Sequence, residues 1–554
     1  MLNDVKELYK QFCREELDEQ GVISKFEINC PDNFNFAYDV VDVIAQATPE
    51  RRAMLWCNDE GEEHTFSFGD IKKYSDKTAN MLLAHGIQKG DKVLLILKRH
   101  YEFWFTILAL HKIGAIAVPA TNLLTTKDIV YRIQSASIKA VVCTADGNLP
   151  DYVNEAQKEC DTLTVKFIVR GKKDGWLDYA AEMESAPEEL PRFENSKFDD
   201  MLLYFTSGTA GYPKMVVHNY AYPLAHIMTA KYWHNVDPDG LHLTVAETGW
   251  AKAVWGKLYG QWLLAAGIFV YDFDKFCPDK VLEKIEQYKI TTFCAPPTIY
   301  RFFIKEGMGN YDLSSLQYAT VAGEALNEEI YKQFIAKTGL RLMEAYGQTE
   351  TTVTLGNFVN AEIKVGSMGK ESPMYDVELV DANDQPVGVG EVGEIVLHTT
   401  DELQIGMFKG YYRDQALTDQ AWHNGYYHTG DTAYRDEDGF IWYVGRTDDL
   451  IKSSGYRIGP FEIESVLMEH PAVLECAITG VPDPIRGQVV KATIVLTKKY
   501  SPSEALAKEL QDYVKKSTAP YKYPRIVEFV EELPKTISGK IRRVEIRRRD
   551  TEKN

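Results

Sequence analysis

The stretch 93–119, VLLILKRHYEFWFTILALHKIGAIAVP, decides the fold. It begins with an apolar run at 93–97, continues with apolar residues at helical spacing over 101–111, and ends with a second apolar run at 115–119. Two short apolar runs joined by a helix are typical of parallel strands with a helical crossover. The stretch therefore predicts a β-α-β unit.

The same alternation recurs further along the chain. Apolar runs of strand length lie at 140–143, 268–271 and 291–295, and a helical pattern at 278–289 precedes the last of them. We therefore predict an α/β fold with a large N-terminal domain of mostly parallel sheets flanked by helices. From Val377 onwards, shorter β-like runs separated by turn residues predict a β-rich subdomain.

A domain boundary is expected at Asp448. It separates a large domain (1–447) from a small, mobile α+β domain (448–554) that has its own pattern of elements. The small domain is expected to contain a helix over 502–516, with Ser501 as its capping residue.

Composition and charge narrow the functional classes. The net charge of -19 disfavours a nucleic-acid-binding protein. Eight cysteines without a CxxC pair indicate neither a cysteine-based zinc site nor a disulfide framework. The N-terminus lacks the features of a signal peptide, and the most apolar stretch, 258–271, is shorter than the roughly 20 residues that cross a bilayer. We expect a soluble cytoplasmic protein without stable membrane insertion.

A loop rich in glycine and hydroxyl residues follows an apolar run in 203–214, LYFTSGTAGYPK. Glycine lets the backbone approach an anion closely, exposed N–H groups and hydroxyls donate to phosphate oxygens, and Lys214 adds positive charge. The spacing does not match the Walker pattern. From spacing alone, a polyphosphate loop and an ordinary surface turn are equally good interpretations.

Further motifs follow in order: AGEA at 322–325, YGQTET at 346–351, YHTGD at 427–431, GRTDD at 445–449 and PKTISGKIRR at 534–543. With them the chain resembles the acyl-CoA synthetases of the adenylate-forming superfamily, and most closely the medium-chain branch. The resemblance covers nearly the whole chain. It implies that a carboxylic acid reacts with ATP to give an acyl-adenylate and pyrophosphate, and that coenzyme A then displaces AMP. One departure is Ala325, where many members have proline.

The resemblance implies an ATP site made of Thr206, Ser207, Gly208, Thr209, Gly211, Lys214, Gly323, Glu324, Ala325, Glu344, Ala345, Tyr346, Gly347, Gln348, Thr349, Asp431, Arg446, Arg457 and Lys540. Thr349 and Glu350 are expected to act in catalysis, with Glu350 as the Mg ligand because hard divalent ions prefer oxygen donors. Asp431 can accept hydrogen bonds from both ribose hydroxyls. Lys540 can stabilise the charge that builds on the α-phosphate during attack. Taken alone, each would more often be a solvated or structural residue.

The small domain is expected to rotate about Asp448 between the two half-reactions. The resemblance implies coenzyme A contacts at Ser454, Gly455, Tyr456, Arg486, Ser517, Tyr523, Pro524 and Arg525. At Gly455 the absence of a side chain suits a narrow tunnel for the thiol.

The acyl pocket is expected at Trp250, Lys252, Trp255, Gly323 and Gly347. Acetate-specific relatives have a tryptophan at the position that matches Gly347, so we predict a larger acid, from short branched to medium-chain. The two tryptophans could cap such a pocket or could simply be core aromatics.

Alternative functions remain open at this point. They are an acetyl- or propionyl-CoA synthetase, an adenylation enzyme that delivers its acyl group to a carrier protein, an oxidative luciferase-like enzyme, and a non-catalytic nucleotide-binding regulator that kept the fold. The chain ends at Asn554, soon after the lysine motif, which favours coenzyme A over a fused carrier domain. A homodimer is compatible with the sequence.

Overall fold

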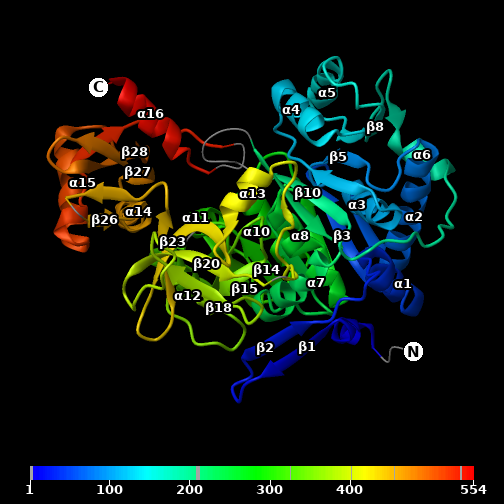
Figure 1. The fold of residues 1–554 in the computed structure, drawn as a ribbon, viewed down its shortest axis with the longest axis horizontal. Coiled ribbons are helices and arrows are strands. Elements are labelled where there is room, and N and C mark those ends of the chain that lie inside the picture. The colour runs from blue at the N-terminus through cyan, green and yellow to red at the C-terminus, as the bar shows by residue number, and fades with distance from the viewer. Residues whose placement is uncertain are drawn as a thin grey trace.

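The computed structural model describes residues 4–206, 213–324, 326–400, 402–454, 456–536 and 540–553. Figure 1 shows a large α/β body and a separate C-terminal lobe, coloured orange to red, at one end. The α/β class expected from the sequence is confirmed.

The predicted β-α-β unit lies in the middle of the first large sheet. Strand β5 (Lys92–Ile96) pairs in parallel with β6 (Ile116–Pro119) and β7 (Ala140–Thr144). Helix α3 (Glu102–Ile113) forms the crossover and is buried along its whole length, which explains why its sequence is almost continuously apolar. The sheet order is β21-β11-β10-β6-β5-β7-β8-β9, with the remaining strands β8 (Val165–Val169), β9 (Leu177–Asp178), β10 (Asp200–Thr206), β11 (Lys214–Asn219) and β21 (Gly410–Tyr411).

The glycine-rich loop joins two strands of this sheet. Strands β10 and β11 are antiparallel neighbours, and Thr206 at the end of β10 pairs with Lys214 at the start of β11. The loop residues 207–212 between them lie outside the described part of the chain.

The second large sheet carries most of the other motifs. Its order is β18-β17-β16-β15-β14-β12-β13-β3-β4, with β3 (Arg52–Asn58), β4 (Glu63–Ser67), β12 (Leu241–Thr244), β13 (Gly267–Asp272), β14 (Thr292–Ala295), β15 (Tyr318–Val321), β16 (Leu342–Gly347), β17 (Val353–Gly356) and β18 (Lys370–Glu371). In this order, every pair of neighbouring strands between β16 and β3 is parallel. The alternation of apolar runs and helical patterns in the sequence predicted this arrangement.

Helices surround both sheets (Figure 1). They are α1 (Val43–Ala47), α2 (Phe68–Ala84), α4 (Thr126–Ala136), α5 (Leu149–Gln157), α6 (Tyr179–Ser185), α7 (Tyr222–Ile227), α8 (Ala251–Lys257), α9 (Tyr259–Leu263), α10 (Pro278–Gln287), α11 (Pro297–Glu306) and α12 (Glu328–Thr338). None of the helices in the described ranges is long and apolar enough to cross a membrane.

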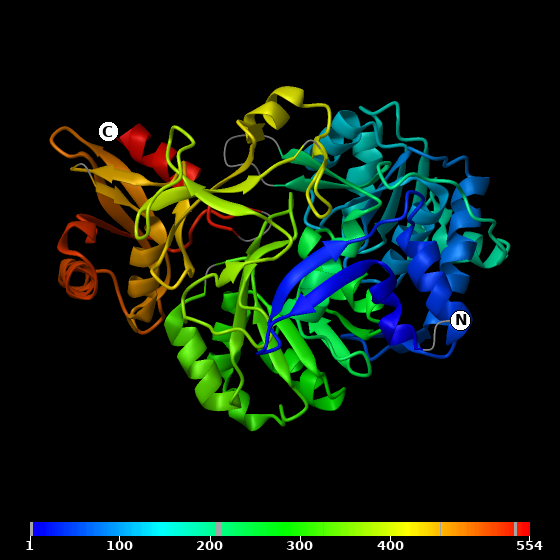
Figure 2. The ribbon, with the colours of Figure 1, turned by 60° about the horizontal axis from the view of Figure 1, so that its bottom comes forward.

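An N-terminal hairpin lies against the large domain, as Figure 2 shows in blue. It consists of β1 (Cys13–Leu17) and β2 (Ile23–Ile28). Glu15 attaches it, because its carboxylate accepts from Lys231 Nζ at 2.6 Å and from the Tyr232 hydroxyl at 2.5 Å.

The β-rich subdomain begins at β19 (Val377–Val380), as expected from the change in sequence pattern at Val377. Strand β23 (Tyr426–Arg435) is its centre and pairs with β20 (Val392–His398), β22 (Trp422–His423) and β24 (Ile441–Arg446). Helix α13 (Gln415–Ala421) leads into β22.

The small domain has a sheet and a core of its own. The sheet contains β25 (Ile451–Ser453), β26 (Tyr456–Ile458), β27 (Val473–Asp483), β28 (Gly487–Leu496) and β29 (Ile526–Phe529), and the helices are α14 (Pro460–Glu469), α15 (Glu504–Ser517) and α16 (Arg543–Lys553). The chain passes from the sheet of β24 to that of β25 between Arg446 and Ile451, so Asp448 lies in the short connection.

The predicted cap of α15 was wrong. Ser503, not Ser501, is the capping residue, and its Oγ accepts from the Leu506 N–H at 3.1 Å. The helix begins at Glu504, which leaves Ser501 too far upstream to reach the unpaired N–H groups of the first turn.

Candidate active site

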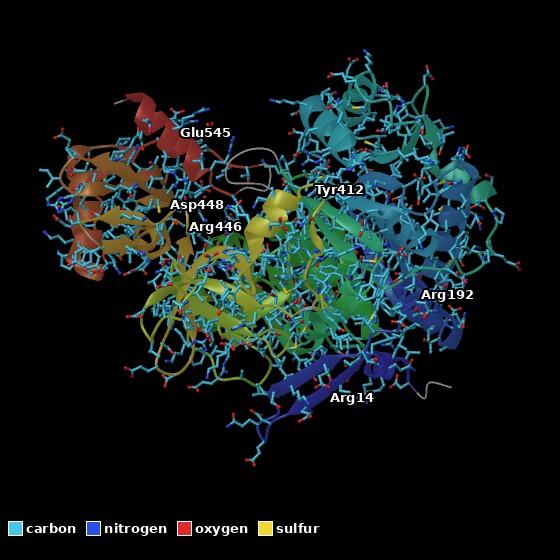
Figure 3. The ribbon with its side chains drawn as sticks, viewed as in Figure 1. Arg14, Arg192, Tyr412, Arg446, Asp448 and Glu545 are labelled. Atoms are coloured by element: carbon cyan, nitrogen blue, oxygen red, sulfur yellow. The ribbon has the colours of Figure 1, made fainter. Side chains whose placement is uncertain are left out.

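A cleft of about 1850 Å³ lies between the large and small domains. Figure 3 labels Arg446 and Asp448 at this junction. The cleft is lined by many of the residues predicted from the motifs, namely Thr206, Lys214, Gly323, Glu324, Glu344, Ala345, Tyr346, Gly347, Gln348, Thr349, Glu350, Asp431, Arg446 and Lys540. The fold thus gathers segments that are far apart in the sequence.

Some predicted residues are elsewhere. Arg457 lies exposed on β26 and is not part of the cleft lining. The predicted positions Ser207, Gly208, Thr209, Gly211, Ala325 and Gly455 fall outside the described residues.

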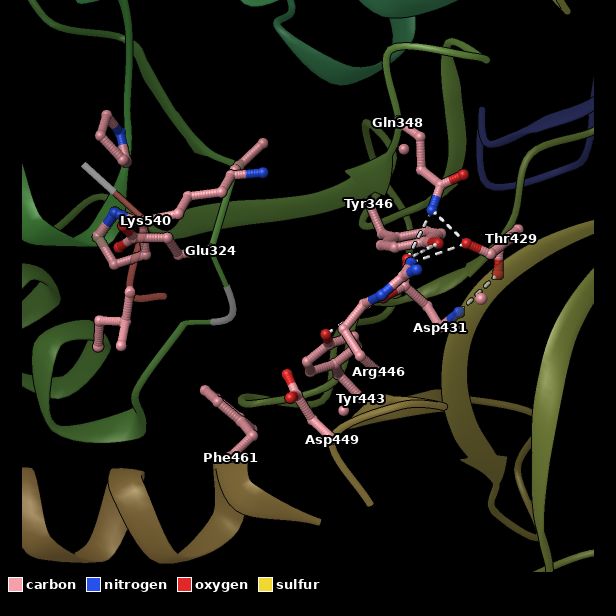
Figure 4. Close-up of a pocket in the computed structure, with 18 of the residues that line it drawn as sticks. Glu324, Tyr346, Gln348, Thr429, Asp431, Tyr443, Arg446, Asp449, Phe461 and Lys540 are labelled. Atoms are coloured by element: carbon pink, nitrogen blue, oxygen red, sulfur yellow. Dashed lines mark hydrogen bonds and ion pairs between the residues drawn. The ribbon is translucent and has the colours of Figure 1, made fainter. Parts of the chain in front are cut away.

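The Asp431 carboxylate is the centre of a hydrogen-bond network on the cleft wall (Figure 4). Its Oδ2 accepts from the Tyr346 hydroxyl at 2.7 Å and from Gln348 Nε2 at 2.6 Å. Its Oδ1 accepts from the Tyr443 hydroxyl at 3.3 Å and lies 3.5 Å from a guanidinium nitrogen of Arg446. The pairing of β23 with β24 places Asp431 opposite Arg446. The carboxylate is therefore held in one orientation, as an acceptor for diol hydroxyls must be.

Two tyrosines in this network were not predicted. Tyr443 contacts Asp431 directly, and the Tyr427 hydroxyl donates to Gln348 Oε1 at 2.7 Å, which fixes the orientation of the amide. Tyr427 is the first residue of the YHTGD motif, so the sequence could have identified it as a site residue. Tyr443 lies two residues before the GRTDD motif, and only the strand pairing brings it to Asp431.

Lys540 enters the cleft from the small domain. Two hydrogen bonds join its backbone to Thr536: Lys540 N donates to Thr536 Oγ1 at 3.1 Å and Thr536 N donates to Lys540 O at 2.7 Å. The residue is exposed and lines the cleft together with Glu324 of the large domain, and Figure 4 labels both. A cation thus faces the motifs of the large domain across the cleft.

Glu344 is a buried acid in the cleft wall. Its Oε1 accepts from the Leu326 N–H at 3.0 Å, and Oε2 has no hydrogen-bond partner among the described residues. Burial raises the pKa of Glu344 to about 8, and the hydrogen bond from Leu326 offsets only part of this effect. Near neutral pH the side chain is therefore largely protonated and can donate a hydrogen bond.

The predicted Mg ligand is held by neighbouring strands and loops. The Tyr411 hydroxyl donates to Glu350 Oε1 at 3.0 Å, and the Phe408 N–H donates to the Glu350 carbonyl at 2.8 Å. His218 Nε2 donates to the carbonyl of Thr349 at 2.7 Å. A carboxylate beside a threonine hydroxyl is an oxygen donor set that fits Mg²⁺.

The five predicted acyl-pocket residues all line the cleft. The sequence suggested an open space beside Gly347, and the structure shows that Trp255 fills it. A Cβ atom at Gly347 would lie 2.6 Å from Trp255 Cη2 and 2.2 Å from the Thr352 carbonyl oxygen. The indole is held by a 3.1 Å hydrogen bond from Nε1 to the Tyr222 hydroxyl. A tryptophan wall is thus present, but α8 supplies it instead of β16.

Lys252 adds a cation to this part of the cleft. Its Nζ donates to the Ala322 carbonyl at 2.5 Å, and burial together with the nearby Lys540 charge lowers the pKa of Lys252.

The predicted coenzyme A residues that the structure describes lie outside the cleft. Most are exposed: Ser454, Tyr456, Arg486, Ser517 and Arg525, with Tyr523 half-buried and Pro524 buried. The Tyr456 ring stacks on the ring of Tyr521, with centroids 4.0 Å apart. Because Tyr521 lies two residues before Tyr523, this contact brings the predicted residues around 456 next to those around 523. Arg486 donates to Ser454 Oγ at 3.2 Å and Arg525 donates to the Tyr523 hydroxyl at 2.9 Å.

Comparison with models of known protein families shows which family the chain belongs to. A family model described as "AMP-binding enzyme" matches residues 41–412, and one described as "AMP-binding enzyme C-terminal domain" matches residues 462–540. The chain belongs to the AMP-binding enzyme family. The family expected from the motifs is thereby confirmed.

Relatives of this AMP-binding enzyme include acyl-CoA synthetases. Mitochondrial acyl-coenzyme A synthetase ACSM3 of Pongo abelii is 40% identical over 535 residues, 95% of this chain and 91% of that protein. Mitochondrial acyl-coenzyme A synthetase ACSM4 of Homo sapiens is 42% identical over 524 residues, 93% of this chain and 90% of that protein. These similarities identify an adenylate-forming acyl-CoA synthetase of the medium-chain branch.

Solved structures of other AMP-binding enzymes share the fold. The anthranilate CoA ligase AuaEII, in complex with anthranoyl-AMP, has a TM-score of 0.86 and 27% identity, and the match covers 95% of this chain and 98% of that one. The acyl-CoA synthetase of Brucella canis has a TM-score of 0.72 and 32% identity, covering 95% and 96%.

Proposed function

We propose that this AMP-binding enzyme ligates short branched to medium-chain carboxylic acids to coenzyme A. It is an ATP-dependent acyl-CoA synthetase. In the first step a carboxylate oxygen attacks the α-phosphorus of ATP and the bond to pyrophosphate breaks. In the second step the thiol sulfur of coenzyme A, having lost its proton, attacks the acyl carbonyl and AMP leaves. The main support is the single cleft that brings Lys540 of one domain to the Asp431 network of the other.

The ATP roles follow from the geometry of the cleft. Asp431, fixed by Tyr346 and Gln348, accepts from the ribose hydroxyls. The ammonium of Lys540 stabilises the charge on the α-phosphate, which is greatest in the transition state. Glu350 and Thr349 hold Mg²⁺, which offsets the charge of the phosphate groups.

The coenzyme A roles require a second orientation of the small domain. Lys540 lines the cleft, whereas Ser454, Tyr456 and Arg486 of the same domain do not. A rigid domain cannot present both surfaces to the cleft at once. Rotation about Asp448 after pyrophosphate release therefore brings the coenzyme A surface to the acyl-adenylate.

The acyl chain is expected to end against Trp255. The indole, locked by Tyr222, sets the depth of the pocket, and Gly347 provides the space that the indole fills. This arrangement supports acids larger than acetate with a defined upper length, while acetate or propionate activation is the alternative that a substrate panel decides.

The decisive experiment separates the two half-reactions. Purified enzyme with ATP and Mg²⁺ is tested against acids from acetate to decanoate and benzoate, and pyrophosphate and acyl-CoA are measured. We expect Lys540→Ala to reduce pyrophosphate release by roughly 10²- to 10³-fold, the scale found for loss of one transition-state charge contact. The variant should still convert a supplied acyl-adenylate to acyl-CoA.

Lys508→Ala is the matched control, since Lys508 lies on the same domain and pairs with Asp512 on the surface. Pyrophosphate release without acyl-CoA would point to a carrier-protein acceptor, and no pyrophosphate with any acid would favour a regulator.

We also propose that the enzyme is cytoplasmic and forms a homodimer. The ACSM3 and ACSM4 relatives, by contrast, are mitochondrial. Cell fractionation and light scattering test these two points.

A further inference from the structure

Three potential metal ligands meet on the β-rich subdomain. Asp384 lies in the turn after β19, His423 ends β22, and His428 lies on β23, the partner strand of β22. One ligand atom from each residue lies within 4.8 Å of the other two. The cluster lines the same cleft but is separate from the predicted Mg ligand Glu350.

Hydrogen bonds at the far side of each ring fix the histidine tautomers. His423 Nδ1 donates to the Gln420 carbonyl at 3.0 Å, and His428 Nδ1 lies 3.4 Å from Glu394 Oε2. With the ring protons on Nδ1, both Nε2 atoms carry lone pairs. A carboxylate that accepts the second N–H of a ligand histidine is the usual outer partner of a metal site.

Both Nε2 lone pairs face the same carboxylate. His428 Nε2 lies 3.9 Å from Asp384 Oδ1, and His423 Nε2 lies 3.9 Å from Asp384 Oδ2. The His428 side chain is only 9% exposed, and its buried Nε2 has no hydrogen-bond partner in the described part of the chain. A cation between the three side chains would give His428 Nε2 the partner that it lacks among the described residues, and His423 and Asp384 would bind it as well.

The two rings stack with centroids 3.8 Å apart and 4° between their planes, which holds both imidazoles side by side next to Asp384. The two separations of 3.9 Å end on different oxygens of Asp384 and are longer than the roughly 3.3–3.6 Å between ligand atoms of a tetrahedral zinc site, so the side chains would draw slightly closer around an ion.

We infer that Asp384, His423 and His428 bind a divalent transition-metal ion of the zinc type. The two imidazole ligands favour this class, whereas Mg²⁺ prefers oxygen ligands. Asn424 Nδ2 holds the Asp384 carboxylate through a 2.5 Å hydrogen bond to Oδ2, and Glu394 orients His428. The ion would fasten the β22–β23 hairpin to the turn that follows β19.

The proposed metal site is also connected, through Glu394, to the part of β23 that carries Asp431. Glu394 Oε1 accepts from the Gly430 N–H at 2.9 Å, and Gly430 directly precedes Asp431. One carboxylate therefore contacts both a metal ligand and the turn that carries the proposed ribose acceptor.

The test is direct metal binding by the full-length, untagged, chelator-treated protein without nucleotide. We expect one equivalent of Zn²⁺ in calorimetry, with affinity little changed by millimolar Mg²⁺. We also expect a Co²⁺ complex with the visible absorption of tetrahedral coordination. His423→Ala and Asp384→Asn should weaken Zn²⁺ binding at least tenfold, since each removes one ligand.

His398→Ala is the matched control. His398 lies on the neighbouring strand β20, where it packs against Tyr426, and it is not one of the three ligands. Unchanged Zn²⁺ binding in His423→Ala, no stoichiometric binding by the wild type, or displacement by equimolar Mg²⁺ would each overturn the assignment. Circular dichroism of the variants shows whether a loss of binding reflects a loss of fold.

Discussion

At the scale of single residues, a buried acid in the cleft links stability to pH. The unfolded chain ionises Glu344 near the ordinary value of 4.5, whereas the folded protein does so only near pH 8. Below pH 4.5 both states are protonated, and between 4.5 and 8 only the unfolded state loses the proton. The stability from this residue is therefore present at low pH and lost as the pH rises through about 8.

We predict that Glu344→Gln flattens this dependence. Loss of one proton changes the free energy of unfolding by about 1.4 kcal/mol per pH unit at most, and the amide cannot ionise. Denaturant midpoints measured from pH 5 to 9 should fall less steeply in the variant. Glu324→Gln, at an exposed position in the same cleft, should keep the wild-type slope. Equal slopes in Glu344→Gln and the wild type would contradict the shift.

A second residue-scale prediction concerns acid length. Removing the indole in Trp255→Ala extends the pocket, so the ratio of kcat/KM for octanoate over butyrate should rise roughly tenfold, the scale of methylene discrimination. Trp176→Ala provides the control, because Trp176 lies outside the cleft. An unchanged length profile in Trp255→Ala would remove its role as the pocket wall.

At the scale of elements, prediction worked where local pattern and tertiary packing agree. The run at 93–97 and the helix at 101–111 became β5 and α3 because both are buried on all sides, which makes their apolar character unambiguous. The prediction of the α15 cap failed because two serines, Ser501 and Ser503, flank Pro502. The sequence does not show which of the two can reach the N–H groups at the start of the helix.

We predict that the two serines differ in their contribution to stability. Ser503→Ala should lower the free energy of unfolding of the small domain by about 1 kcal/mol, because it removes the acceptor for the Leu506 N–H. Ser501→Ala should change it little. Urea titrations followed by far-ultraviolet circular dichroism measure both, and equal losses would show that the cap contact is unimportant.

The site was predictable only in part. The motif residues were found from their order along the chain, but the contacts of Tyr443 with Asp431 and of Trp255 with Gly347 join distant segments. Such contacts depend on strand pairing and helix placement, which the order of motifs does not specify. The histidine cluster has the same origin, as three short segments meet on one sheet.

At the scale of the whole molecule, one contact offers a way to test the proposed domain rotation. Asn327 Nδ2 of the large domain donates to the Ser465 carbonyl of α14 in the small domain at 3.0 Å. A disulfide between cysteines placed at these two positions should hold the orientation in which Lys540 lines the cleft. The oxidised double variant should then release pyrophosphate but form little acyl-CoA, at least tenfold less than after reduction.

The single variants Asn327→Cys and Ser465→Cys control for the loss of either side chain, and both should make acyl-CoA in either redox state. Undiminished acyl-CoA formation by the cross-linked protein would show that one orientation serves both steps.

The separate core of the small domain has a consequence for heat inactivation. Its buried residues, among them Ile463, Ile478 and Leu510, form a cluster distinct from those beneath the large sheets. Calorimetry should therefore resolve two melting events, and catalysis should disappear with the one that belongs to the lobe carrying Lys540. An enzyme warmed between the two events would be inactive although most of its mass is still folded, and cooling should restore its turnover without refolding the larger part.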